Sequence, residues 1–155
     1  MPQLQLKLLT LFCGCLATIA SATTFYVDSL EGNDSHIGTS PNEAWKTLVH
    51  VNGRAYSPGD RILFNAGCTW QGKLNPKGSG DAGRPIVIDM YGQGGKPLID
   101  GNTSTGDGVV YFFNQQHWEV NNLQITNDAP TGGDRRGGIP DPRSNADFAN
   151  WVSHQ

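Results

Sequence analysis

Short apolar runs separated by turn-forming residues dominate the chain after residue 60. Each run is only a few residues long, and Gly, Asn, Asp or Pro stands between one run and the next. Runs of this length, bounded by turn formers, are typical of β-strands rather than helices. They lie at 62–64, 71–74, 85–91, 97–100, 109–113 and 118–126. The pattern therefore predicts an all-β protein built from many short strands.

Two sets of apolar residues recur at nearly fixed spacing along this region. Successive members of each set stand 24 or 25 positions apart: Ile62, Ile86 and Val110, and Leu74, Leu98 and Leu123. A sustained period of this length indicates a solenoid, in which each turn of chain packs on the turn before it. Neither a helix nor leucine-rich spacing lies within the repeat, so a parallel β-coil is favoured. An antiparallel sandwich with coincidental spacing remains the alternative.

The segment before residue 60 predicts one strand and one short helix. Residues 24–28 are β-branched and aromatic, which favours a strand. Ser40, Pro41 and Glu43 match the start of a helix with a capping box. The helix would place an apolar face over the open end of the coil and cover its first edge strand. That face consists of Ala44, Trp45, Leu48 and Val51.

The segment 1–22 has the features of an export signal. Lys7 precedes an apolar run at 8–20, and Ala20, Ser21 and Ala22 form a small-x-small cleavage site. As a helix, this run would extend about 20 Å, which is short of the roughly 30 Å hydrocarbon core of a bilayer. We therefore expect a cleaved signal peptide and a secreted or periplasmic protein, with no membrane contact after cleavage. A buried N-terminal helix and an uncleaved anchor are the alternatives.

Composition supports a turn-rich β protein and excludes some partners. The chain has 20 Gly and 9 Pro among 155 residues, and 16% of its residues are charged. Its net charge is −3 without a basic run, which argues against a nucleic-acid partner. Cys68 is the one cysteine left after signal cleavage, so it allows neither an internal disulfide nor a cysteine-based zinc site. We expect its thiol to be buried.

A series of small motifs runs in order through residues 25–127. The series includes FYVD at 25–28, GND at 32–34, PGDRI at 58–62, GRPI at 83–86 and KPLIDG at 96–101. It resembles the N-terminal part of secreted right-handed parallel β-helix proteins of the pectate-lyase-like superfamily. The resemblance implies an all-β, right-handed parallel β-helix of about three rungs with a short N-terminal capping helix. Members of this superfamily are mainly polysaccharide lyases and glycoside hydrolases, so it also implies a polysaccharide partner, acidic in part of the family, and Ca²⁺ in the lyases.

The same resemblance divides the chain into four parts. We expect a signal peptide at 1–22, a strand and capping helix at 23–60, β-helix rungs at 61–138 and an irregular tail at 139–155. The rung pattern stops near Gly138, as it would in a truncated or frameshifted gene product. The expected function is that of a polysaccharide-processing lyase or hydrolase fragment without a complete active site, inactive by itself. The alternative is a non-catalytic secreted β-helix that binds glycan or has a structural role.

Candidate site residues are few, and no catalytic residue is identified. Asp134, Arg135 and Arg136 form the most polar cluster, and an arginine can hold a sugar carboxylate with two hydrogen bonds. Trp118 would stack on a sugar ring if it faced outward, although burial is the commoner fate of tryptophan. No acidic residues in the rungs are 24 or 25 positions apart, and no metal-binding motif is present, so no metal site is predicted.

Overall fold

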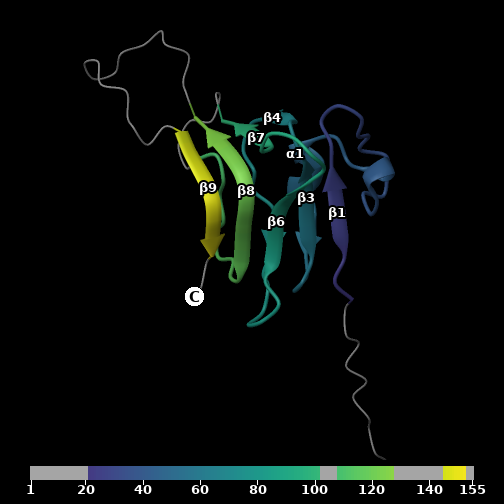
Figure 1. Ribbon diagram of the computed structural model, residues 1–155. Helices are drawn as coiled ribbons and strands as arrows, with labels where there is room; N and C mark the ends of the chain where they lie inside the picture. The colour runs from purple at the N-terminus through teal and green to yellow at the C-terminus, as the bar shows by residue number, and fades with distance from the viewer. Residues whose placement is uncertain (1–20, 102–107, 128–144, 153–155) are drawn as a thin grey trace, which may run out of the picture.

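The protein consists mainly of strands, with little helix. The computed structural model describes residues 21–101 and 108–127, together with the backbone of 145–152. Figure 1 shows the strands side by side, with the helical segments confined to one end. This confirms the all-β prediction. The strands are β1 (Thr24–Val27), β2 (Ala55–Tyr56), β3 (Arg61–Asn65), β4 (Thr69–Gln71), β5 (Lys77–Gly78), β6 (Ile86–Tyr91), β7 (Leu98–Asp100), β8 (Trp118–Thr126) and β9 (Asn145–Val152); the helical segments are η1 (Pro41–Glu43, a 3-10 turn) and α1 (Leu48–Asn52).

Parallel pairing organises the main sheet. Its strand order is β1-β3-β6-β8-β7-β4, and every neighbouring pair in this order is parallel. The short strands β2 and β5 form a second parallel pair. Parallel neighbours cannot be joined by a tight hairpin. The chain must therefore return to the same end of the sheet before each new strand begins.

Strand β8 belongs to both halves of the main sheet. Its first residues, from Trp118 to Val120, pair with β6, and its last residues, from Gln124 to Thr126, pair with β7. Between them, Asn122 has a φ of 50°, a left-handed conformation that asparagine tolerates better than most residues. The chain also turns at the corresponding place between β3 and β4 and between β6 and β7. Successive passes of the chain thus follow the same course of strand, corner and strand.

The register differs from the predicted repeat. Ile62 pairs with Ile88 rather than with Ile86, and Ile86 pairs with Trp118. Val110 forms its bridge with Leu74, which belonged to the other predicted set. The predicted fixed spacing is therefore wrong. Backbone hydrogen bonds set the register between strands, whereas the loops that join the strands differ in length.

The core lies between the inward faces of the strands. Alternation along β3 buries Ile62 and Phe64, and alternation along β8 buries Trp118 and Val120. Each apolar side chain of this size contributes about 1.5–3 kcal/mol when buried. Cys68 is a free cysteine in the same core, 2% exposed, which confirms the prediction of a buried thiol.

The predicted capping helix is interrupted. Pro41 begins only a 3-10 turn, and the Ser40 hydroxyl contacts the Glu43 carboxylate at 3.4 Å instead of capping the backbone. The chain then extends, so that Trp45 forms a parallel bridge with Val27. The α-helix itself starts at Leu48, with Thr47 as its N-cap.

Asp34 explains this interruption, because its carboxylate accepts hydrogen bonds from the backbone N–H groups of Lys46 and Thr47 and so holds them outside a helix. The four residues predicted to form the buried face are nonetheless all buried: Ala44, Trp45, Leu48 and Val51.

The C-terminal region differs from the expected irregular tail. Residues Asn145–Val152 form β9, which pairs antiparallel with β8 along almost its whole length. In Figure 1, β9 lies beside β8 at the edge of the sheet. The other residues of the predicted tail lie outside the described residues, as do residues 1–20 of the predicted signal. Among the residues that the structure describes, no helix is long and apolar enough to cross a membrane.

Candidate functional site

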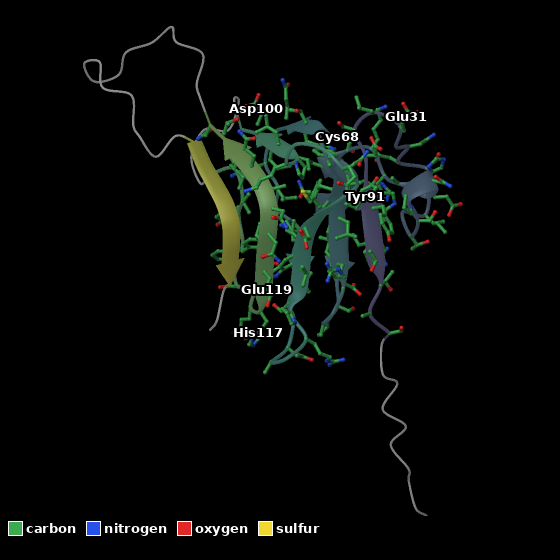
Figure 2. The ribbon with its side chains drawn as sticks, viewed as in Figure 1. Glu31, Cys68, Tyr91, Asp100, His117 and Glu119 are labelled. Atoms are coloured by element: carbon green, nitrogen blue, oxygen red, sulfur yellow. The ribbon has the colours of Figure 1, made fainter. Side chains whose placement is uncertain are left out.

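A polar cluster forms where three parallel strands end at the same edge of the sheet. Asp28 follows β1, Asn65 is the last residue of β3, and Tyr91 is the last residue of β6. Cys68 lies in the turn after Asn65. Figure 2 shows Tyr91 and Cys68 at this edge. Parallel pairing brings these residues together, because strands running the same way end at the same edge.

Asp28 is the centre of this cluster. Only 6% of the residue is exposed. One carboxylate oxygen accepts hydrogen bonds from the backbone N–H groups of Leu30 and Glu31, at 2.8 and 3.1 Å, and from the Cys68 thiol at 3.4 Å. The other accepts one from the Asn65 side-chain amide at 2.7 Å. The carboxylate therefore joins the loop after β1 to the corner after β3.

Two aspartates in the N-terminal region stabilise the fold more strongly when they are ionised. Burial alone would raise the pKa of Asp28, but hydrogen bonds from the backbone N–H groups of Glu31 and Leu30 and from Asn65 and Cys68 outweigh burial and lower it. The pKa of Asp34 is lowered in the same way, because hydrogen bonds from Thr47 and Lys46 and the nearby His50 outweigh the effect of burial. Both carboxylates thus bind a proton less readily in the folded chain than in the unfolded chain.

Acid should therefore destabilise the protein through these two groups. Their contribution to the free energy of unfolding is complete above the ordinary aspartate pKa of 3.8 and is lost as the pH falls below that value toward the lower folded pKa. Urea unfolding across this acidic range should show a smaller pH dependence in the Asp28→Asn and Asp34→Asn variants. An unchanged slope in both variants would contradict the assignment.

Tyr91 contributes an aromatic ring and a hydroxyl to the edge. Its ring meets the Tyr26 ring edge to face, with 5.1 Å between centroids. Burial raises the pKa of Tyr91 to about 12, with smaller contributions from Asp28, Cys68 and Tyr26. The hydroxyl is buried and has no hydrogen-bond partner among the described residues.

Removing this hydroxyl should cost no stability. We expect Tyr91→Phe to leave the free energy of unfolding unchanged or to raise it by up to about 1 kcal/mol, because an unpaired buried hydroxyl is unfavourable. Tyr56→Phe is the matched control, since the Tyr56 hydroxyl is also buried but donates to the Val51 carbonyl at 3.1 Å; that variant should lose about 1 kcal/mol. Urea denaturation measures both, and a larger loss in Tyr91→Phe than in the control would be the contrary result.

A second polar group lies on the outer face of the main sheet. The Asp89 carboxylate accepts from the Arg61 guanidinium at 3.4 Å and from the Asn122 amide at 2.9 Å. Glu119 lies on the same face, because its register partner Val87 is two positions before Asp89 on β6. Figure 2 shows Glu119 near the start of β8. The group gives this face hydrogen-bond donors and acceptors.

The predicted repeat spacing does not bring Asp89 and Glu119 to the same face. The observed register pairs Arg61 with Val87 and Val87 with Glu119, which brings charged residues from three strands to one face. The alternation within β8 is the usable signal, because Glu119 stands between the buried Trp118 and Val120. The loop lengths that set the register cannot be read from that alternation.

The structure gives a clear position for one of the four predicted site residues. Trp118 is 0% exposed, and its indole N–H donates to the Gly78 carbonyl at 3.1 Å. No ring face is left for a sugar, because Tyr56 and Phe112 pack around it. The other three residues lie outside the described residues: Asp134, Arg135 and Arg136.

The described part of the chain contains no assembled cation site. Within it, no three His, Cys, Asp or Glu side chains lie close enough to hold a metal ion. These residues therefore do not form a cluster of carboxylates such as the resemblance implied for the Ca²⁺ of lyases.

Comparison with known proteins points to one kind of enzyme. No protein-family model matches the chain. This chain is 41% identical, over 137 aligned residues, to a lacto-N-biosidase from Bifidobacterium longum subsp. longum. The match covers 72% of this chain and 9% of that protein. Two crystal structures of the GH136 lacto-N-biosidase from Eubacterium ramulus are also similar. The native protein has a TM-score of 0.65 at 27% identity, and the selenomethionine derivative has 0.63 at 26%.

The extent of these matches limits what they say about this chain. In each solved structure the match covers 72% of this chain but only 21% of the Eubacterium ramulus chain. The chain thus spans less than a quarter of the proteins it resembles. The similarity therefore concerns one part of larger proteins.

Proposed function

We propose that this chain is a segment of a secreted glycoside hydrolase-type protein, and that its parallel strands are the first turns of a right-handed β-helix. The sequence similarity to the Bifidobacterium lacto-N-biosidase, at 41% identity, is the observation that carries the proposal, and the crystal structures of the Eubacterium ramulus enzyme support it with a similar backbone arrangement. The corners after β3 and β6 and at Asn122 support the coil, since successive passes of the chain turn at the same place.

Hydrolysis of a glycan is the reaction class that this similarity favours. A glycoside hydrolase breaks the bond between the anomeric carbon and the leaving oxygen, and water supplies a hydroxyl to the carbon and a proton to the oxygen. Glycans that carry lacto-N-biose are the proposed substrates, following the name of the relatives. The expected lyase reaction has no supporting observation among them.

This segment contributes scaffold rather than the reacting groups. The carboxylate of Asp28 is committed to four hydrogen bonds, and that of Asp89 is held by Arg61 and Asn122. We therefore expect this chain alone to release no sugar from a glycoside. Its role would be to start the coil and to support the turns that follow.

A segment exchange tests the proposed function. The matched segment of the Eubacterium ramulus enzyme is replaced by the corresponding residues of this chain, and p-nitrophenol release is measured with p-nitrophenyl lacto-N-bioside. We expect the exchanged enzyme to retain activity within about tenfold of the parent, a barrier change of about 1.4 kcal/mol. The matched control is the same exchange carrying Trp118→Ala, which should lose activity because its core is disrupted.

Activity as low as that of the enzyme lacking the segment, in a protein with normal circular dichroism, would show that the two segments are not equivalent. Retention of the glycan by the exchanged protein without turnover would instead favour the non-catalytic, glycan-binding alternative.

Export is a separate part of the proposal. The apolar run at 8–20 and the Ala20-Ser21-Ala22 site are its support. Fusing residues 1–22 to alkaline phosphatase, which is active only outside the reducing cytoplasm, should give active enzyme in a bacterial host. Replacing Leu8, Leu9 and Leu11 with aspartate should abolish that activity, and equal activity of the two fusions would argue against a signal.

A further inference from the structure

Two aromatic side chains stand on the outer surface of the segment before β8. Val110 forms a parallel bridge with Leu74, and the backbone N–H of Tyr111 donates to the Leu74 carbonyl at 3.0 Å. Val110 and Phe112 pack against the core. Tyr111 is half-buried and Phe113 is exposed, and their rings stack on each other, so both rings lie on the side away from Phe112.

The two outward rings are nearly parallel. Their planes differ by 3°, and their centroids are 6.3 Å apart. Phe113 is 64% exposed, which is high for a phenylalanine. The inward ring between them anchors the segment, since Phe112 lies 4.9 Å from Trp118, centroid to centroid. The packing of Phe112 against the core thus fixes the backbone to which the two outward rings are attached.

Polar residues of the neighbouring segment lie beside the Tyr111 side of this pair. The Lys73 ammonium lies 5.2 Å from the centroid of the Tyr111 ring, within the range of a cation–π interaction. Asn75 follows the buried Leu74 on the neighbouring segment, and its side-chain oxygen accepts from the Lys77 ammonium at 2.8 Å.

The neighbouring segment is also held in place. The Asn52 amide donates to the Lys73 carbonyl at 2.8 Å, and its oxygen accepts from the Asn75 N–H at 2.7 Å. Both segments beneath the surface are therefore fixed by hydrogen bonds before any ligand arrives, so little ordering is required on binding.

We propose that Tyr111 and Phe113, with Lys73 and Asn75 beside them, form a binding subsite for a sugar ring. A pyranose presents C–H groups on its face and hydroxyls around its rim. Exposed aromatic rings match the face, and the neighbouring ammonium and amide groups match the rim, as in other ligand sites lined by aromatic side chains with a few polar groups. The choice of a sugar as ligand rests on the proposed function, whereas the surface itself does not.

The subsite is tested on the whole chain by NMR titration with the free disaccharide lacto-N-biose. We expect saturable shifts of the Tyr111 and Phe113 ring signals, with a dissociation constant of about 1 mM. Phe113→Ala and Tyr111→Ala should each weaken binding by about tenfold or more. Phe113→Tyr keeps the ring and should restore binding. Val49→Ala is the matched control, because Val49 is an apolar side chain on α1 that is 80% exposed, and it should bind as the original chain does.

Three results would overturn the subsite. The first is the absence of saturable shifts at any disaccharide concentration. The second is equal binding by Phe113→Ala and the original chain. The third is a shift of the same ring signals with protein concentration alone, which would identify the surface as a contact between copies of the chain. Failure of the segment exchange together with saturable binding would refute the proposed function and leave the subsite in place.

Discussion

Replacing Trp118 with alanine should lower the free energy of unfolding by about 4 kcal/mol, because removing a fully buried tryptophan leaves a large cavity. Trp118 is 0% exposed and contacts the rings of Tyr56 and Phe112. The variant would also leave the Gly78 carbonyl without its indole donor. Urea denaturation followed by circular dichroism measures the change.

Trp118→Phe separates the two contributions. It keeps an aromatic ring in the core but removes the indole N–H, so we expect a smaller loss of about 1–3 kcal/mol. If Trp118 instead contacted a sugar from the surface, Trp118→Ala would weaken glycan binding and leave stability almost unchanged. That outcome would contradict the core position.

The second large effect is expected from Asp28→Ala, with a loss of about 3 kcal/mol, because the substitution removes the shared acceptor of four hydrogen bonds that are part-buried or buried. Those donors are the N–H groups of Leu30 and Glu31, the Asn65 amide and the Cys68 thiol. The loss should appear in urea denaturation at neutral pH, where the carboxylate is ionised.

Asp81→Ala provides the control for a surface carboxylate. Asp81 contacts Arg84 at 2.6 Å, but both side chains are more than half exposed, and exposed ion pairs contribute little. We expect its loss to stay below about 1 kcal/mol. Equal losses in Asp28→Ala and Asp81→Ala would contradict the buried network. A double-mutant cycle with Asn65→Ala should show coupling, because the two side chains share a hydrogen bond.

The sequence was most informative where a residue's position depends on its immediate neighbours. Alternation and turn residues located the strands around Ile62, Ile86 and Trp118, and they indicated which side chains point inward. The buried thiol of Cys68 followed from its apolar chemistry and its lack of a partner cysteine. These properties depend on a few residues of chain, which a sequence displays directly.

Features that depend on distant contacts could not be predicted in the same way. The helix expected after Ser40 is interrupted because Asp34, well before it in the chain, binds the backbone of Lys46 and Thr47. The strand register was mispredicted because loops of unequal length join the strands. The cluster around Asp28 cannot be predicted from the sequence either, because its partner Asn65 lies on another strand.

The two polar or aromatic surfaces described above also depend partly on local sequence and partly on distant contacts. The sequence predicts a strand-like segment at 109–113. The contacts of this segment with Leu74 and with the Lys73 ammonium depend on the fold. Arg61, Asp89 and Glu119 share a face because of the observed register. The proposal that these surfaces bind a glycan rests on sequence similarity to lacto-N-biosidase, because neither composition nor spacing indicates a ligand class.

Parallel pairing of strands and bridges places Asp28 beside Asn65 and Tyr111 beside Lys73, so the proposed function and the proposed subsite both depend on it. NMR of the isotope-labelled chain can measure the register between β3 and β6 through distances between backbone protons. We expect amide-to-Hα contacts consistent with Ile62 opposite Ile88 and no close Hα–Hα contacts, since those arise between antiparallel strands. Close Hα–Hα contacts between β3 and β6 would contradict the parallel pairing, and contacts that place Ile62 opposite Ile86 would contradict the observed register.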